Sequence, residues 1–296
     1  MKPVVILDSG VGGTTLFAQI RQCMAWLPVV YCADSVAIPY GSLSQDQLYE
    51  RVSLCLASLA TICSPALVII ACNSASVAIL ERIRKEMEVP VVGVVPAIKT
   101  AAEKTQNKTV GLLATQATVN SPYTDALVAA FASGINVIRI GSSRLVEIAE
   151  ASFFGDAVNR DEVAEILAAF TSLAKPPDHV VLGCTHFPLL RKELSDCAPD
   201  ITWVDSGQAV ARRVLSLIDR NEYRNIESVS YTAITTGAYF YQRGGGSSVV
   251  SADQRNVCRK AFRRLGFSIV EPFGSLKKTM IRGAATKNGN GQRYRR

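Results

Sequence analysis

The sequence predicts an α/β fold of two doubly wound parallel-sheet domains, with the active site in the cleft between them. Short apolar, β-branched runs alternate with helical stretches along the chain. These runs are apolar throughout, which is typical of strands buried on both faces of a parallel sheet. A weak internal repeat indicates two similar units, and 296 residues are enough for two ordinary domains.

Nine short runs predict strands: PVVIL, VVYCA, ALVIIA, VPVVGVV, TVGLLA, NVIRI, HVVLG, ITWV and FSIV. Helical patterns lie between them and are clearest over residues 45–62, 75–87, 160–173 and 207–218. Because each strand is followed by a helix, the units are of the βαβ kind and the sheet they build is mainly parallel.

Two pairs of segments resemble each other within the chain. LVIIACNSASV (67–77) and VVLGCTHFPLL (180–190) share a strand, a small residue, a cysteine, two polar residues and a helix start. LDSG at 7–10 and VDSG at 204–207 form the second pair. With a crossover at Val95-Pro96, these pairs predict the following division: a first domain of residues 1–95 plus 207–275, a second domain of residues 96–206, and a basic, disordered tail of residues 276–296.

Composition favours a globular, cytoplasmic protein. Apolar residues make up 48% of the chain, and no run reaches the length of a membrane span or of a signal-peptide core. The eight cysteines are expected to stay reduced, since no secretion signal is seen.

The net charge of +7 equals the seven basic residues between Lys277 and Arg296, a stretch that holds no acid. A basic tail can contact nucleic acid or acidic lipid, but solubility is the favoured role here because no structured element accompanies the charge. The alternative is a binding protein that works through this tail. The sequence leaves the oligomeric state open, with a homodimer among the alternatives.

Four polar clusters follow predicted strands, where parallel sheets bind ligands. They are Asp8-Ser9-Gly10, Cys72-Asn73-Ser74, Thr115 with Thr118, and Cys184-Thr185-His186. Each comes just before a loop or a helix start, whose free N–H groups attract anions and stabilise a thiolate. We therefore expect lowered cysteine pKa values and a bound carboxylate.

The pair Cys184 and His186 has several interpretations. Zinc is poorly supported because a second ligand pair is missing, so we expect no metal. A cysteine hydrolase would leave Cys72 without a role, and core packing ignores the polar neighbours of both thiols. Two thiols facing each other across a cleft would give both cysteines a role, because one can remove a proton from a carbon while the other returns one to its opposite face.

Four motifs in order, ILDSGVGGTT, IPYGSLS, IIACNSASV and VVLGCTHFPLL, resemble the glutamate racemase family of the aspartate/glutamate racemase superfamily. The resemblance runs from residue 4 to about residue 220. It implies two α/β domains, no cofactor, and interconversion of L- and D-glutamate, which supplies D-glutamate for peptidoglycan and cell-wall synthesis. Aspartate racemase, or another member of the superfamily, is the alternative.

The resemblance also implies residue roles. Cys72 would act on D-glutamate and Cys184 on L-glutamate, with Asp8 and His186 assisting. Glu150 matches an acid near the second thiol, although Glu147 competes for that place. The residues implied to contact the substrate are Asp8, Ser9, Tyr40, Gly41, Asn73, Ser74, Thr185 and His186. The chain departs from the family pattern at Ser74 and Phe187, where Thr and Tyr are common, and the segment YTAITTGAYFYQRGGGSSVV has no assigned role.

Overall fold

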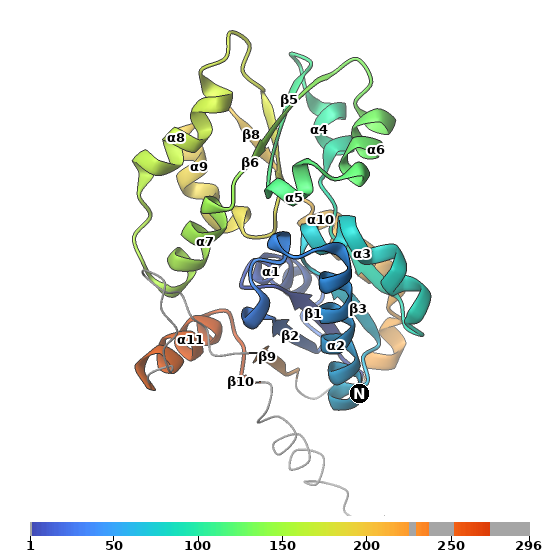
Figure 1. Ribbon diagram of the computed structural model, residues 1–296. Helices are drawn as coiled ribbons and strands as arrows, with labels where there is room; N and C mark the ends of the chain where they lie inside the picture. The colour runs from blue at the N-terminus through green and yellow to red at the C-terminus, as the bar shows by residue number, and fades with distance from the viewer. Residues whose placement is uncertain (1, 225–228, 237–251, 273–296) are drawn as a thin grey trace, which may run out of the picture.

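The computed structural model describes residues 2–224, 229–236 and 252–272. Figure 1 shows two sheets, one in each half of the molecule, with helices packed on them. Every strand pair in both sheets is parallel, which confirms the predicted fold class. The predicted basic tail, residues 276–296, lies outside the described residues.

The first domain is built on a sheet with the strand order β10-β9-β2-β1-β3-β4. Its strands are β1 (Val4–Asp8), β2 (Val29–Ala33), β3 (Leu67–Ile70), β4 (Val91–Gly93), β9 (Tyr231–Thr235) and β10 (Ile269–Pro272). Its helices are α1 (Thr14–Cys23), α2 (Gln45–Cys63), α3 (Asn73–Glu86), α10 (Gly207–Leu217) and α11 (Ala252–Arg264), with the 3-10 turns η1 (Ser35–Ala37), η2 (Tyr40–Ser42) and η4 (Arg220–Tyr223).

The second domain is built on a sheet with the order β6-β5-β7-β8. Its strands are β5 (Thr109–Ala114), β6 (Asn136–Gly141), β7 (His179–Gly183) and β8 (Thr202–Val204). Its helices are α4 (Ile98–Lys104), α5 (Gln116–Val119), α6 (Pro122–Phe131), α7 (Arg144–Phe154), α8 (Arg160–Thr171), η3 (Phe187–Leu190) and α9 (Arg191–Cys197).

The two sheets repeat one topology. The order β2-β1-β3-β4 in the first corresponds to β6-β5-β7-β8 in the second, so β3 and β7 are equivalent strands. Cys72 and Cys184 follow these two strands, which explains the first internal repeat. The second pair of segments is not a repeat, because LDSG ends β1 whereas VDSG follows β8. The strand equivalent to β1 is β5, and Thr115 directly follows the end of that strand.

All nine predicted strands are present, together with one that the sequence pattern did not predict. β9 lies between β2 and β10 and is formed by Tyr231–Thr235, in the segment for which no role was assigned. Tyr231 packs edge-on against Phe17 of α1 at 5.1 Å. Contacts with residues far away in the chain define this strand, and a local pattern does not reveal such contacts.

Local sequence explains where two of the helices begin. At α2, Ser44 and Gln47 form a reciprocal capping box, which satisfies two N–H groups that would otherwise lack partners. At α6, Ser121 accepts a hydrogen bond from the Thr124 N–H, and Pro122 takes the first helical position. The chain passes between the domains before α4 and again before α10, and Ser206 Oγ donates to the carbonyl of Val95 at 2.5 Å, which ties the two passages together.

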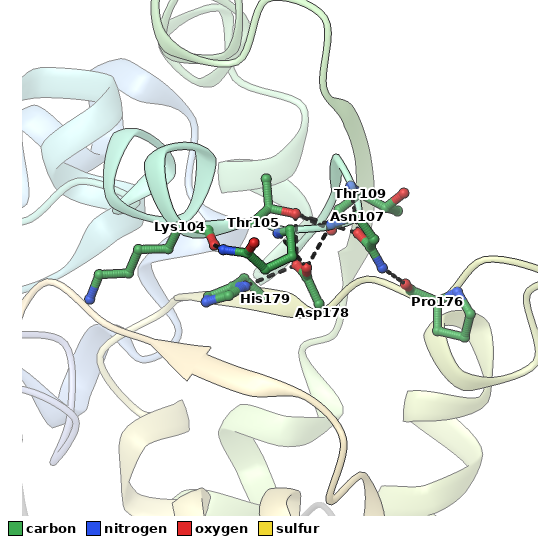
Figure 2. Close-up of polar contacts among 8 residues, drawn as sticks. Lys104, Thr105, Asn107, Thr109, Pro176, Asp178 and His179 are labelled. Carbon is green, nitrogen blue, oxygen red and sulfur yellow. Dashed lines mark hydrogen bonds and ion pairs between the residues drawn. The ribbon is translucent and has the colours of Figure 1, made fainter.

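Asp178 directly precedes β7 and holds the loop that leads into β5, at the amino ends of these two strands (Figure 2). Its carboxylate accepts hydrogen bonds from Thr105 Oγ1 at 2.7 Å and from the N–H groups of Gln106 at 2.7 Å and Asn107 at 2.9 Å. It also lies 2.9 Å from His179 Nδ1. His179, the first residue of β7, is therefore a structural residue.

Candidate active site

Two contacts join the domains where the carboxyl ends of their strands meet. The Val11 N–H of the first domain donates to Glu150 Oε1 of the second at 2.8 Å. Ser74 Oγ at the start of α3 lies 2.9 Å from Thr115 Oγ1, which follows β5. The predicted polar clusters are therefore drawn together at this seam.

Asp8 ends β1 and is completely buried. Its carboxylate accepts the N–H groups of Ser9 at 2.9 Å and Gly13 at 2.6 Å, so it fixes the glycine-rich turn that leads into α1. Burial raises the pKa of Asp8 to about 6, although the charge of His186 and both N–H donors oppose this rise. Asp8 can thus gain or lose a proton near neutral pH.

Cys72 caps α3 and is buried. The expected lowering of its pKa is wrong for this structure. Burial raises the pKa of the thiol well above its usual 9, and the charges of Asp8 and Cys184 raise it further, while the N–H groups of Ala75 and Ser74 only partly offset this. Since the charges of Asp8 and Cys184 act on Cys72, these groups share one electrostatic environment.

Cys184 and His186 follow β7 and are both buried. Cys184 Sγ lies 3.8 Å from His186 Nδ1, and His186 Nε2 lies 2.7 Å from Glu150 Oε1. Burial lowers the pKa of His186, but the hydrogen bonds with Cys184 and Glu150 and the charges of both groups outweigh it and hold the pKa well above 6.5. These contacts favour the charged form of the imidazole, which is placed to stabilise a thiolate.

Of the two acids considered on α7, Glu150 lies at the site and Glu147 does not. Glu150 is buried against His186, whereas Glu147 is exposed and pairs with Arg144 at 2.7 Å. The three-residue spacing leaves the two acids on one broad side of the helix, so sequence alone did not separate them.

The glycine-rich turn of the first domain packs directly on these groups. A Cβ atom at Gly12 would lie 2.5 Å from His186 Nδ1 and 2.7 Å from its backbone N. One at Gly10 would lie 2.0 Å from Glu150 Oε1. The glycines therefore permit close approach to the second domain.

A cluster of three buried hydroxyl groups lies on the other side of the seam. Thr115 Oγ1 is 3.0 Å from Thr118 Oγ1, and Ser74 Oγ is 3.3 Å from the latter. Gly41 lies beside them, since a Cβ there would be 3.4 Å from Ser74 Oγ. Thr115 and Thr118 were noted in the sequence as a cluster at a strand end but were not predicted to be site residues. Only the contact across the seam reveals their place.

The hydroxyl of Tyr40 is occupied by another partner. It donates to Asp34 Oδ2 at 2.8 Å, and Asp34 is also bound by Arg51 and Thr236. Tyr40 is buried in the same apolar cluster as Cys72. The ring and the backbone of Tyr40 are therefore the parts that remain available to contact a ligand.

A cavity of about 230 Å³ opens at the seam. Asn73, Cys184 and Thr185 line it, together with residues of α1 and of the passage into α10. The Asn73 Nδ2 donor is buried and has no hydrogen-bond partner, so it is available to a ligand. Cys72, Asp8, Ser9, Tyr40 and Gly41 do not line this cavity.

No group of three or more His, Cys, Asp or Glu side chains that could hold a metal ion is present within residues 2–224, 229–236 and 252–272. In that same part of the chain, no helix is long and apolar enough to cross a membrane.

Residues 14–214 match the family model for Asp/Glu/hydantoin racemases. The chain belongs to the Asp/Glu/hydantoin racemase family. This membership confirms the resemblance seen in the motifs, and racemases are isomerases.

Several proteins to which this chain is similar are named glutamate racemases. The enzyme of Pectobacterium carotovorum is 49% identical over 216 residues, which are 73% of this chain and 76% of that protein. The structure of Escherichia coli glutamate racemase, solved with L-glutamate and the activator UDP-MurNAc-ala, is 38% identical, with a TM-score of 0.80 and coverage of 92% of this chain and 98% of that one. The Aquifex pyrophilus enzyme is 29% identical, with a TM-score of 0.67 and coverage of 93% and 99%.

Proposed function

We propose that this protein is a cofactor-independent glutamate racemase in which Cys72 and Cys184 work from opposite sides of the α-carbon. The observation that carries the proposal is the equivalent placement of the two thiols after β3 and β7, at a seam where each has its own acid or base. The identity of 47–49% to glutamate racemases supports glutamate as the substrate.

The reaction moves one proton at each face of the substrate. The Cys184 thiolate takes the α-proton of L-glutamate, the electron pair stays on the α-carbon, and the Cys72 thiol gives its proton to the opposite face. D-glutamate leaves with Cys72 as thiolate and Cys184 as thiol, and the reverse reaction begins from that form. Two bases remove the need for one group to reach both faces.

The charges at the seam favour the form that accepts L-glutamate. Burial keeps Cys72 protonated, whereas Cys184 lies beside a charged His186 that Glu150 stabilises. Asp8, with a pKa of about 6, is the proposed acceptor for the Cys72 proton when D-glutamate is the substrate. His186 is the matching partner of Cys184, and Glu150 assists it.

The substrate carboxylates need donors, and neutral donors are available. Asn73 Nδ2 is unpaired, Ser74 stands at the start of α3, and Thr185 lines the same cavity as Asn73. Such preorganised donors also stabilise the charge that develops when the α-proton leaves. We assign substrate contacts to these three side chains, to Ser9 and Asp8, to His186, and to the backbone at Tyr40 and Gly41. Thr115 and Thr118 join them through the hydroxyl cluster.

The test is exchange of the α-hydrogen in heavy water, measured separately with L- and D-glutamate and with both enantiomers of aspartate. We expect exchange and racemisation of both glutamate enantiomers, with aspartate at least about 100-fold slower. Faster turnover of aspartate would make the protein an aspartate racemase, and the absence of exchange with all four would refute the reaction. The role of D-glutamate in peptidoglycan synthesis, the cytoplasmic location and a homodimeric state remain part of this proposal.

A further inference from the structure

The last turn of α7 belongs to the second domain but packs against the core of the first. Phe153 and Phe154, both half-buried, pack against the apolar cluster that contains β1, α1 and α11. The rings of Phe153 and Phe262 are 5.4 Å apart and edge-on, and Phe262 is on α11. Figure 1 shows α11 directly beside the end of α7.

Glu150 lies one turn before these rings on the same helix face. Residues at positions i, i+3 and i+4 of a helix point the same way, and Glu150, Phe153 and Phe154 have this spacing. The face of α7 that brings a carboxylate to His186 is therefore the face that docks on the first domain. A helix turn is stiff, so the position of the rings fixes the position of the carboxylate.

The partner of Glu150 in the first domain rests on the same aromatic cluster. Phe262 packs on Tyr31 at 5.8 Å, and the Tyr31 hydroxyl donates to the carbonyl of Gly10 at 2.6 Å. Gly10 directly precedes Val11, whose N–H binds Glu150. Both sides of the Val11–Glu150 contact are thus anchored to Phe262, one through Tyr31 and one through Phe153.

We propose that Phe153 is a positioning residue for the reaction, because its contact with Phe262 of α11 holds Glu150 between Val11 and His186. The inference rests on the proposed function, in which His186 serves Cys184. It predicts that loosening the ring contact weakens deprotonation of L-glutamate, which depends on Cys184, and spares deprotonation of D-glutamate, which depends on Cys72. Helix α11 then affects the chemistry without touching the substrate.

The experiment compares Phe153→Leu, Phe153→Tyr and wild type by α-hydrogen exchange in heavy water with each glutamate enantiomer. The measured quantity is the ratio of the L rate to the D rate. A loss of folded enzyme reduces both rates equally and leaves this ratio unchanged. We expect Phe153→Leu to lower the ratio about 10-fold, because small misplacements of catalytic groups are costly, and Phe153→Tyr, which keeps the ring, to stay within about 2-fold of wild type.

Phe170→Leu is the matched control, because it removes the same ring from the second-domain core on α8, away from the seam. It should lower the melting temperature while leaving the exchange ratio as in wild type. An unchanged ratio in Phe153→Leu, or an equal change in Phe170→Leu or Phe153→Tyr, would overturn the positioning role. If wild type itself exchanges neither enantiomer, the proposed function fails first, so the two failures are distinguishable.

Discussion

Cys72 and Cys184 occupy the same place in two copies of one topology, at the ends of β3 and β7. Their surroundings are nevertheless different. Cys72 shares its environment with Asp8, an anion when ionised, and Cys184 with the charged imidazole of His186. The repeated topology therefore places two thiols in equivalent positions, and the side chains around them give the two thiols different electrostatic surroundings.

The first prediction concerns these thiols. Cys72→Ser and Cys184→Ser should each reduce racemisation by about 10²- to 10⁴-fold, because a hydroxyl is a much weaker proton acceptor than a thiolate. In heavy water, Cys72→Ser should lose α-hydrogen exchange mainly with D-glutamate, and Cys184→Ser mainly with L-glutamate. The two enantiomers have equal free energy, so kcat/KM stays equal in both directions for every variant, and only exchange separates the thiols.

Cys197→Ser is the control for this pair. Cys197 is half-buried on α9, and its Sγ atom contacts the Arg160 carbonyl at 3.6 Å, far in the fold from the seam. Its replacement should leave both exchange rates within about 2-fold of wild type. Full racemase activity in either Cys72→Ser or Cys184→Ser would contradict a two-base reaction.

The second prediction separates the charge of Glu150 from its geometry. Glu150→Gln keeps an Oε1 acceptor for Val11 N–H and His186 Nε2–H, whose distances are 2.8 Å and 2.7 Å in the native protein. Removing the carboxylate charge should lower the pKa of His186, which that charge helps to raise. The imidazolium is then lost at a lower pH, so the alkaline limb of L-glutamate deprotonation should move to lower pH, with the rate near pH 8 falling about 10-fold.

Glu147→Gln is the matched variant on the same helix, since Glu147 is exposed and paired only with Arg144 among the contacts described. It should leave the pH profile of exchange unchanged. Identical profiles for Glu150→Gln and wild type would show that the carboxylate charge does not act on His186.

The third prediction is a pH dependence of stability due to Asp8. Its folded pKa of about 6 lies above its usual 3.8, so the folded state holds more protons than the unfolded state between these values. Stability therefore falls as pH rises from about 4 to about 6. At about 1.4 kcal/mol per pH unit, the pKa difference corresponds to about 3 kcal/mol.

Asp8→Asn should lack this dependence. The free energy of unfolding of the variant, relative to wild type, should rise by up to about 3 kcal/mol between pH 4 and pH 7, measured by urea denaturation at each pH. A constant difference across that range would mean that the pKa of Asp8 is not raised by burial.

The sequence was sufficient to predict most of the sheet and the two thiols. An apolar run that ends in a small residue and then a cysteine, as at Cys72 and Cys184, is a local pattern. β9 was missed because its identity depends on packing beside β2 and β10, which lie far away in the chain.

The parts of the site that depend on three-dimensional packing were not predictable. Thr115 and Thr118 gain their place through Ser74 of the other domain. The hydroxyl of Tyr40 is bound by Asp34, which no motif indicates. The pKa of Cys72 is raised because the folded chain buries the thiol and places it near the charges of Asp8 and Cys184, although its position at a helix start alone favours a lower value.

The fourth prediction concerns Asp178, which lies at the amino end of β7 (Figure 2). Each of its two carboxylate oxygens receives two contacts. Asp178→Asn replaces one oxygen by a donor, which then faces other donors. We expect a loss of about 2 to 4 kcal/mol in the free energy of unfolding, with racemisation at 25 °C unchanged because the seam is not touched.

The pKa of Asp178 provides the sign of the pH effect. Burial would raise this pKa, but the bonds from His179, Thr105, Asn107 and Gln106 hold it well below its usual value of 3.8. The stabilisation is therefore present above about pH 4 and is lost as pH falls through the lower folded value. Asp46→Asn, at an exposed acid paired with Arg82, should cost no more than about 0.5 kcal/mol. Equal losses of unfolding free energy in the two variants would mean that Asp178 is an ordinary surface acid. A loss of racemisation at 25 °C in folded Asp178→Asn would connect the amino end of β7 to the active site.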